Sequence, residues 1–261
     1  MNGSPPGAPP GAALPRAVVL DTDGVLLDSA VVHAAAWKTA FDACLDELAP
    51  APGDWVPFDA DADYRRFVDG RSRYDGARAF LTARGIRLGP GEPGDPPGCG
   101  TVWAVAARKE AAFLDRLATQ GVAAFDDVVT ALGALRSLHV PCAAVSASRH
   151  ARAPITAAGL DPYLAAVVDG GDAARLGLPG KPDPALFLHA TGLLGADPSG
   201  TAVVEDALAG VRAARHGGFG LVVGVDRTPD GHDTAALREQ GADLVVTDLA
   251  ELVREVWGER A

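Results

Sequence analysis

Short, wholly apolar runs recur along the chain and constrain its fold more than any other feature. The run at residues 17–20 reads Ala-Val-Val-Leu, and the one at residues 221–225 contains only aliphatic side chains and glycine. Runs of about four to eight such residues are typical of strands whose two faces are both covered, as in a parallel sheet. We expect strands at residues 17–20, 140–145, 165–168, 201–204, 221–225 and 244–246.

Helical segments separate these runs. Asp183-Pro184 precedes the apolar segment 185–194 and Gly195 follows it, which predicts a helix with an Asp N-cap, a first-turn proline and a C-terminal glycine. Strands that alternate with helices pair in parallel, and the helices cover both faces of the sheet. The predicted fold class is therefore α/β, with a parallel sheet as its core.

The alternation stops between residues 29 and 121, where no convincing strand occurs. We expect helices at residues 31–48, 74–84 and 102–120, and an irregular loop at residues 89–100, which are crowded with glycine and proline. This stretch is interpreted as a helical insertion. The predicted organisation is a flexible tail at residues 1–16, a core at residues 17–28 and 122–261, and a helical domain at residues 29–121.

Composition disfavours several classes of partner. The 261 residues include 23 Lys and Arg against 34 Asp and Glu, a net charge of −11 that disfavours binding to nucleic acid or anionic membranes. The three cysteines, Cys44, Cys99 and Cys142, show no CxxC spacing, so we expect neither a disulfide framework nor a zinc site. The first residues lack the basic region of a signal peptide, and no segment is long enough to span a membrane. We expect a cytoplasmic monomer.

Two carboxylates follow the first apolar run, in the sequence Asp21-Thr22-Asp23-Gly24. Alternate residues of a strand project the same way, so Asp21 and Asp23 would point into one pocket. Paired carboxylates there can bind a hard cation while one attacks and the other transfers protons. The alternative is a strand followed by an ordinary turn, since Asp and Gly are common turn residues.

Polar residues also follow later apolar runs, where the ligand crevice of an open parallel sheet lies. Ser146 follows one strand, Glu205 and Asp206 follow another, and Lys181 lies in a Gly-Lys-Pro loop. Glu205 or Asp206, with Asp21, would supply oxygen ligands for Mg²⁺, while Ser146 and Lys181 would hold phosphoryl oxygens. A single serine or loop lysine is usually structural, but their joint order favours phosphoryl transfer.

The series Asp21-x-Asp23-Gly24-Val25, Val145-Ser146, Lys181-Pro182 and Glu205-Asp206 resembles the four motifs of the haloacid dehalogenase superfamily, in order and over nearly the whole chain. The resemblance implies a Rossmann-like core with an inserted helical cap domain, an aspartyl-phosphate intermediate and Mg²⁺. Asp21 would be the nucleophile and Asp23 the general acid and base. The implied metal ligands are Asp21, Asp23, Glu205 and Asp206. The second aspartate is typical of phosphate chemistry and disfavours dehalogenation.

The stretch from Asp28 to Lys38 is similar to the hinge and first cap helix of the β-phosphoglucomutase-like subfamily. Its His33 and Trp37 share one helix face, a spacing that ordinary packing would also explain. The segment 70–73 resembles the cap loop whose last arginine binds the distal phosphate. Arg108-Lys109 resembles the basic pair of the cap. The segment 146–148 resembles the mutase form of the second motif. The implied substrate-binding residues are Ser29, His33, Trp37, Arg73, Lys109, Ser148 and Arg149.

Some positions depart from that pattern. Thr22 stands where a larger apolar residue is more common, Glu110 stands where the subfamily commonly has Asn, and Arg149-His150 replaces the more usual Lys-Asn. The loop at residues 89–100 also lengthens the cap. With these changes, the substrate could also be an altered sugar phosphate or a cyclitol phosphate.

Three functions remain open at this point. The favoured one interconverts β-glucose 1-phosphate and glucose 6-phosphate through a bisphosphate intermediate, with the phosphorylated sugar and the bisphosphate as partners. A mutase needs two phosphate sites, whereas the first alternative, a sugar or other small-molecule phosphatase, needs only one. The second alternative, a non-catalytic binding protein, has no positive support because no catalytic residue of the motifs is missing.

Overall fold

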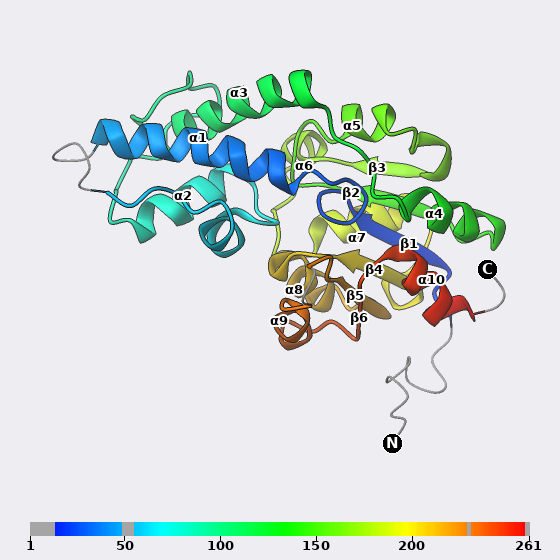
Figure 1. Cartoon of the computed structure of the whole chain (residues 1–261). Helices are drawn as coiled ribbons and strands as arrows, with labels where there is room; N and C mark the ends of the chain where they lie inside the picture. The colour runs from blue at the N-terminus through cyan, green and yellow to red at the C-terminus, as the bar shows by residue number, and fades with distance from the viewer. Residues whose placement is uncertain (1–13, 49–54, 229–230, 259–261) are drawn as a thin grey trace. The chain divides into compact units, whose positions relative to one another are not determined.

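The computed structural model describes residues 14–48, 55–228 and 231–258, which form two compact units (Figure 1). The first unit runs up to Asp28 and resumes at Ala123, and the second is Ser29–Val122. Most of the expected tail, residues 1–13, lies outside the described residues. At its described end, the N–H of Arg16 donates to the Gly200 carbonyl at 2.8 Å.

A six-stranded parallel sheet in the order β3-β2-β1-β4-β5-β6 forms the core of the first unit. The central strand β1 has β2 on one side and β4 on the other, with Leu20 in register with both Ala144 and Val204. The predicted α/β class is confirmed. The strands are β1 Ala17–Asp21, β2 Cys142–Val145, β3 Ala166–Val168, β4 Thr201–Glu205, β5 Leu221–Val225 and β6 Leu244–Val246.

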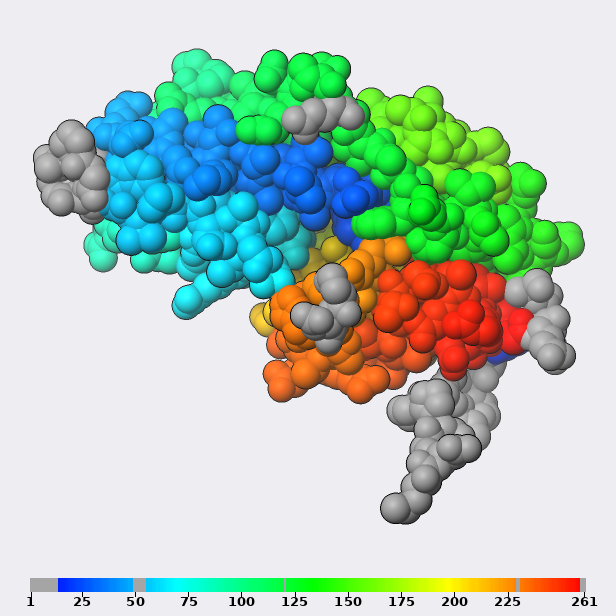
Figure 2. Space-filling model, in the orientation of Figure 1, coloured from blue at the N-terminus to red at the C-terminus, as the bar shows by residue number. Residues whose placement is uncertain are grey.

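Helices cover both faces of this sheet, which explains why the interior positions of its strands are apolar. Val19 packs in one cluster with Phe187 of α7 and Val211 of α8, while Val18 and Leu20, which project to the opposite face, have no exposed surface. The outer side of α10 is visible in red in Figure 2. The helices of this unit are α4 Val128–Ser137, α5 Arg152–Ala157, α6 Gly170–Leu176, α7 Ala185–Leu193, α8 Leu208–His216, α9 Thr234–Glu239 and α10 Leu249–Trp257, with 3₁₀ turns at Asp161–Tyr163 and Pro198–Gly200.

α7 begins at Ala185 as predicted, but its N-cap is Pro184 and not Asp183. The Asp183 carboxylate accepts a hydrogen bond from the Ala185 N–H at 2.9 Å. The carboxylate therefore still satisfies one of the N–H groups that a helix leaves without an intrahelical partner at its start.

The second unit is helical, with α1 Ala30–Leu48, a π-helical turn Tyr64–Val68, α2 Arg73–Ala83 and α3 Val102–Gln120. Its core is aromatic, since the Phe41 ring lies 5.1 Å from that of Phe58 and 4.1 Å from that of Phe80. The three predicted helices are found, each bound within one residue of the observed one. The π-helical turn has no counterpart in the prediction.

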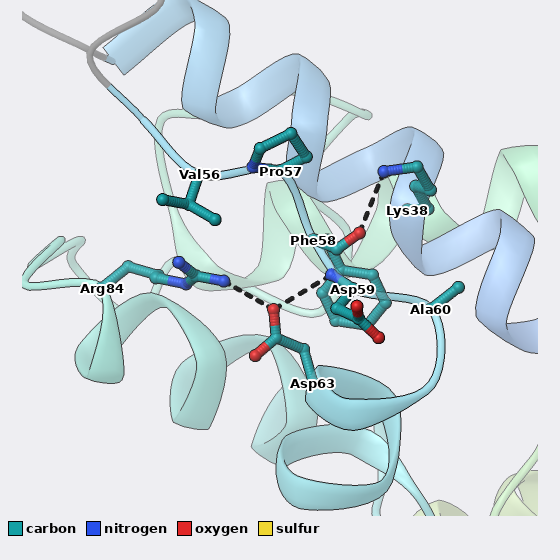
Figure 3. Close-up of a pocket in the computed structure, with 8 residues that line it drawn as sticks. All are labelled: Lys38, Val56, Pro57, Phe58, Asp59, Ala60, Asp63 and Arg84. Carbon is teal, nitrogen blue, oxygen red and sulfur yellow. Dashed lines mark hydrogen bonds and ion pairs between the residues drawn. The ribbon is translucent and has the colours of Figure 1, made fainter.

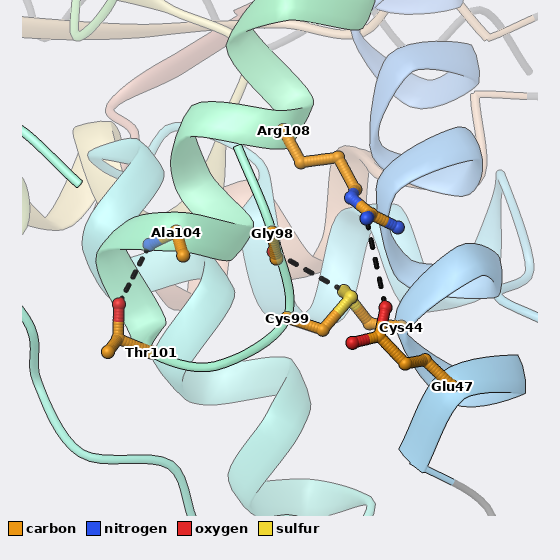
Figure 4. The surroundings of a disulfide bond; sticks show 7 residues. All are labelled: Cys44, Glu47, Gly98, Cys99, Thr101, Ala104 and Arg108. Atoms are coloured by element: carbon orange, nitrogen blue, oxygen red, sulfur yellow. Dashed lines mark hydrogen bonds and ion pairs between the residues drawn. A yellow bond between two sulfur atoms is a disulfide. The ribbon is translucent and has the colours of Figure 1, made fainter. Parts of the chain in front are cut away.

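Cys44 and Cys99 form a disulfide in the second unit, so the expectation that spacing gives no disulfide is wrong. The bond ties α1 to the glycine-rich loop before α3, with Cα atoms 5.3 Å apart and a sequence separation of 55 (Figure 4). The spacing of the cysteines in the sequence cannot reveal this pair, because it is tertiary packing that brings Cys44 and Cys99 together. The expectation of a cytoplasmic protein therefore draws no support from the cysteines. Cys142 is a buried free thiol.

In the part of the chain that the structure describes, no helix combines the length and the apolar character needed to cross a membrane.

Candidate active site

Asp21, the last residue of β1, lies in a buried ionic cluster with Lys181 and Glu205. The Lys181 ammonium donates to Oδ1 of Asp21 and, at 2.6 Å, to Oε2 of Glu205. Lys181 is 3% exposed and Glu205 fully buried. Burying an unpaired charge costs free energy. Because Lys181 pairs with both carboxylates, it offsets the cost of burying them at the edge of the sheet.

Burial and the neighbouring charges shift the pKa values of the groups in this cluster. Burial, followed by the neighbouring charge of Glu205, raises the pKa of Asp21 well above its usual value, against the opposing effect of Lys181. Burial alone would lower the pKa of Lys181, but the two carboxylates outweigh it and raise that pKa. A further cation at this point would stabilise the ionised carboxylates.

Three carboxylates are arranged as a candidate metal site. Asp21, Glu205 and Asp206 each offer an oxygen, and these atoms lie within 4.8 Å of one another. Two glycines make room for them. A Cβ at Gly24 would lie 1.7 Å from Oδ2 of Asp206, and one at Gly210 would lie 2.0 Å from Cδ of Glu205. Carboxylate oxygens are the ligands that Mg²⁺ prefers, so the residues present fit a hard divalent cation.

Asp23 is held beside Asp21 but outside that group of three carboxylates. Its own N–H donates to Oδ2 of Asp21 at 2.9 Å, and the Ser146 hydroxyl donates to its carboxylate at 3.2 Å. Thr22 lies between the two acids, and its hydroxyl donates to the Val145 carbonyl at 3.0 Å. The polar residue at position 22 thus adds a side-chain bond between the end of β1 and the end of β2.

The loop after β2 extends the site through Ser148. The Ser148 N–H donates to Oγ of Ser146 at 3.1 Å, and the Ser148 carbonyl accepts from the Gly170 N–H at 2.9 Å. A Cβ at Gly170 would lie 2.5 Å from the Ala147 carbonyl oxygen, so only glycine permits this approach. The prediction missed Gly170, although its place after β3 was a usable signal. Arg149 lies on the same loop and is exposed.

His33, Trp37 and Lys109 come together in the second unit. The Lys109 ammonium lies 2.9 Å from Nδ1 of His33 and 5.6 Å from the Trp37 ring centroid, and it is buried. Phe113, which the prediction missed, completes the cluster, because its ring stacks on His33 at 4.2 Å and lies 4.6 Å from the ammonium. The Ser29 carbonyl accepts from the His33 N–H at 2.9 Å, so Ser29 borders the same cluster.

Arg73 forms an ion pair with Glu110 in the second unit. Nη1 of Arg73 lies 2.6 Å from Oε2 of Glu110, and the two side chains are 20% and 17% exposed. Arg73 opens α2, with Ser72 as its N-cap. The glutamate at the position where Asn is common in the subfamily therefore compensates the charge of the arginine expected to grip a distal phosphate. Arg108 extends instead toward Glu47 beside the disulfide, at 3.8 Å (Figure 4).

A separate pocket of about 570 Å³ lies in the second unit (Figure 3). The described residues that line it include none of the predicted site residues. Its basic groups are paired, since Lys38 donates to the Phe58 carbonyl at 2.9 Å and Arg84 pairs with Asp63 at 2.5 Å. We assign this pocket no part in the chemistry at Asp21.

Comparisons with known proteins place the chain in a family. A model of the haloacid dehalogenase-like hydrolase family matches residues 15–218. The chain belongs to this family. It is 44% identical over 239 residues, 91% of each chain, to a protein of Mycobacterium tuberculosis (strain CDC 1551 / Oshkosh) named β-phosphoglucomutase. Both resemblances predicted from the motifs are confirmed.

The proteins similar to this chain differ in their named activity. The trehalose-phosphate phosphatase of Mycobacterium leprae is 36% identical over 151 residues, which are 56% of this chain and 32% of that protein. A crystal structure of β-phosphoglucomutase from Clostridium difficile has a TM-score of 0.72 and 20% identity, and covers 95% of this chain and 97% of that one, a likeness of fold alone. The family assignment supports an enzyme of phosphoryl transfer or phosphate hydrolysis in general.

Proposed function

We propose that this haloacid dehalogenase-like enzyme interconverts β-glucose 1-phosphate and glucose 6-phosphate through a bisphosphate intermediate. The observation that carries the proposal is the buried cluster of Asp21, Lys181 and Glu205, with Asp23 and Ser146 bonded around it. Similarity to a β-phosphoglucomutase over nearly the full length of both chains supports this substrate class.

Asp21 would act as the nucleophile. Its carboxylate oxygen attacks phosphorus, the phosphorus–oxygen bond to the sugar breaks, and an aspartyl phosphate forms. Lys181 and Ser146 would hold phosphoryl oxygens, since each already donates a hydrogen bond toward one of the two aspartates. A bound Mg²⁺, held by the candidate metal site, would screen the repulsion between the nucleophile and the phosphate.

Asp23 would move the proton in both directions. Its protonated form gives the proton to the departing sugar oxygen, and its ionised form takes one from the hydroxyl that next receives the phosphoryl group. The Ser146 hydroxyl, 3.2 Å from its carboxylate, supports this role by orienting the group. Exclusion of water during the cycle would keep the aspartyl phosphate from being hydrolysed.

A mutase also needs to hold the phosphate that is not reacting. Arg73, Ser148 and Arg149 are proposed for this second phosphate, because guanidinium groups bind phosphate in a bidentate manner. His33, Trp37 and the other members of their cluster are proposed as the sugar-facing part of the second unit. With both phosphates held in turn, isomerisation proceeds without net consumption of phosphate.

A phosphatase acting on a small phosphorylated molecule is the second candidate. It is favoured by the ion pair of Arg73 with Glu110, which weakens any second phosphate site. The similarity to trehalose-phosphate phosphatase over part of the chain points the same way. A purely binding function has no support, since the catalytic groups of all four motifs lie together.

The two candidates differ in where the phosphoryl group goes. The protein is incubated with Mg²⁺, β-glucose 1-phosphate and a bisphosphate primer, and glucose 6-phosphate and free phosphate are followed separately. We expect glucose 6-phosphate to predominate, and Asp21→Asn to abolish both products. Predominant free phosphate would exclude the mutase, and an active Asp21→Asn variant would exclude the mechanism in either form.

A further inference from the structure

Arg227, in the loop after β5, donates hydrogen bonds to the turn that follows the two aspartates. Its Nε donates to the Gly24 carbonyl at 3.2 Å and its Nη2 to the Val25 carbonyl at 2.9 Å. These carbonyls belong to the two residues directly after Asp23. Arg227 is more than 200 residues away in sequence, so its contacts come from the fold rather than from local structure.

The guanidinium is itself fixed from the other side. It forms a bidentate pair with Asp127, at 2.9 and 3.1 Å, and lies 3.8 Å from the Phe125 ring centroid. Asp127 in turn accepts from the Leu249 N–H at 2.7 Å. A planar guanidinium with this many fixed partners loses its rotational freedom, so it holds the two carbonyls at defined positions.

The turn that Arg227 contacts contains a left-handed glycine just past the end of β1. Gly24 adopts a left-handed conformation with φ of 81°, and β1 has already ended at Asp21. Asp23 lies beyond the six-stranded ladder, in a turn closed by its own bonds, from the Gly24 N–H to the Leu27 carbonyl at 2.9 Å and from the Leu27 N–H to the Thr22 carbonyl at 2.8 Å. Glycine has the greatest backbone freedom of any residue, and the Gly24 carbonyl is one of the two that Arg227 fixes from outside the turn. The Arg227 bonds restrict the backbone next to the carboxylate that would transfer the proton.

We propose that Arg227 is a positioning residue that acts through Asp23. It does not touch the reacting atoms. By holding the Gly24 and Val25 carbonyls, it keeps the Asp23 carboxylate aligned with the sugar oxygen during proton transfer, a step in which a small displacement is costly. This inference rests on the proposed phosphoryl transfer through Asp21.

Two phosphoryl donors distinguish a loss of Asp23 positioning from a general loss of active-site structure. A sugar oxygen leaves only with a proton, whereas the nitrophenolate of p-nitrophenyl phosphate leaves without one. For Arg227→Met we expect kcat on β-glucose 1-phosphate to fall about 100-fold with little change in KM. The first-turnover release of nitrophenolate from p-nitrophenyl phosphate reports formation of the aspartyl phosphate and not its later hydrolysis, and its rate should fall less than about tenfold. Asp23→Ala serves as the reference for loss of the proton donor and should show the same asymmetry.

Arg215→Met is the matched control. Arg215 also bridges a main-chain carbonyl and a carboxylate in the first unit, donating to Gly241 at 2.9 Å and pairing with Asp243 at 2.5 Å. This variant should be less stable than wild type, and any loss of its activity should be the same for both phosphoryl donors. If Arg227→Met does not fold, Arg227→Lys, which keeps the charge but not the bidentate geometry, should show the same asymmetry at smaller size.

If Arg227→Met lost the same fraction of its rate with both donors, the inference would be overturned while the proposed function remained intact. A wild-type protein that turns over neither donor would overturn the proposed function and the inference together.

Discussion

Replacing Glu110 by glutamine tests whether the Arg73 ion pair limits the second phosphate site. The two side chains are 2.6 Å apart and about four-fifths buried. Glutamine keeps the shape of the side chain and an oxygen that accepts from Arg73, but it removes the negative charge. The Glu110→Gln variant therefore leaves the guanidinium in place with its positive charge available to a phosphate.

The size of the effect follows from the distance between charges. A phosphate on the free side of the guanidinium would lie about 6 Å from Glu110, where two unit charges repel by about 3 kcal/mol at an effective dielectric constant of about 20. Glu110 is 17% exposed, so solvent screens part of this repulsion. We expect a net gain of about 1.5 kcal/mol, equivalent to about tenfold tighter binding of the bisphosphate.

The assay measures the concentration of bisphosphate primer that gives half-maximal formation of glucose 6-phosphate, together with the release of free phosphate. Glu110→Gln should lower that concentration about tenfold and raise the ratio of glucose 6-phosphate to free phosphate. Glu47→Gln is the matched control, because Glu47 pairs with Arg108 at 3.8 Å and is 59% exposed. Unchanged or weaker primer activation in Glu110→Gln would refute the reasoning.

Three further predictions concern stability. Burial opposes ionisation of Asp127, but hydrogen bonds, first of all from Arg227, outweigh it and lower its pKa. Asp127→Asn should therefore cost about 2 kcal/mol in urea unfolding at neutral pH, and less as the pH falls through that pKa. Burial raises the pKa of Cys142 from 9.0 to about 12. Wild-type stability should thus fall by up to about 4 kcal/mol between those pH values, a slope that Cys142→Ala removes. Reducing the Cys44–Cys99 disulfide, with its separation of 55 residues, should cost about 4 kcal/mol and lower Tm.

Each of these stability predictions has an outcome that contradicts it. A constant difference between wild type and Asp127→Asn down to acid pH would exclude the assigned pKa shift. An alkaline slope that persists in Cys142→Ala would have another source. A reductant that lowers Tm as much in the Cys44→Ser/Cys99→Ser double variant as in wild type would act elsewhere than on the disulfide.

The strands were the most predictable part of the fold, for a physical reason. β5 and β6 have the bounds read from the sequence, because a strand buried on both faces is apolar at every position. Short helices such as α4 and α6 escaped prediction, since 10 and 7 residues give the apolar periodicity too few turns to be recognised.

In the site, residues at strand ends were predictable, whereas partners chosen by tertiary packing were not. The sheet brings Asp21, Lys181 and Glu205 together as expected from their order. Strand alternation does not by itself place Asp23, because β1 ends at Asp21. The contacts of Glu110 and Arg227 depend on segments distant in sequence, and no local pattern marks them.

The central claim is that Asp21 carries the phosphoryl group. Wild-type protein is mixed with Mg²⁺ and the bisphosphate primer, quenched in cold acid, and analysed by intact mass and peptide mapping. The account predicts one phosphoryl group per chain, located on Asp21 and absent from Asp21→Asn. Turnover by a wild-type protein that never carries a phosphoryl group, or that carries it on another residue, would contradict it.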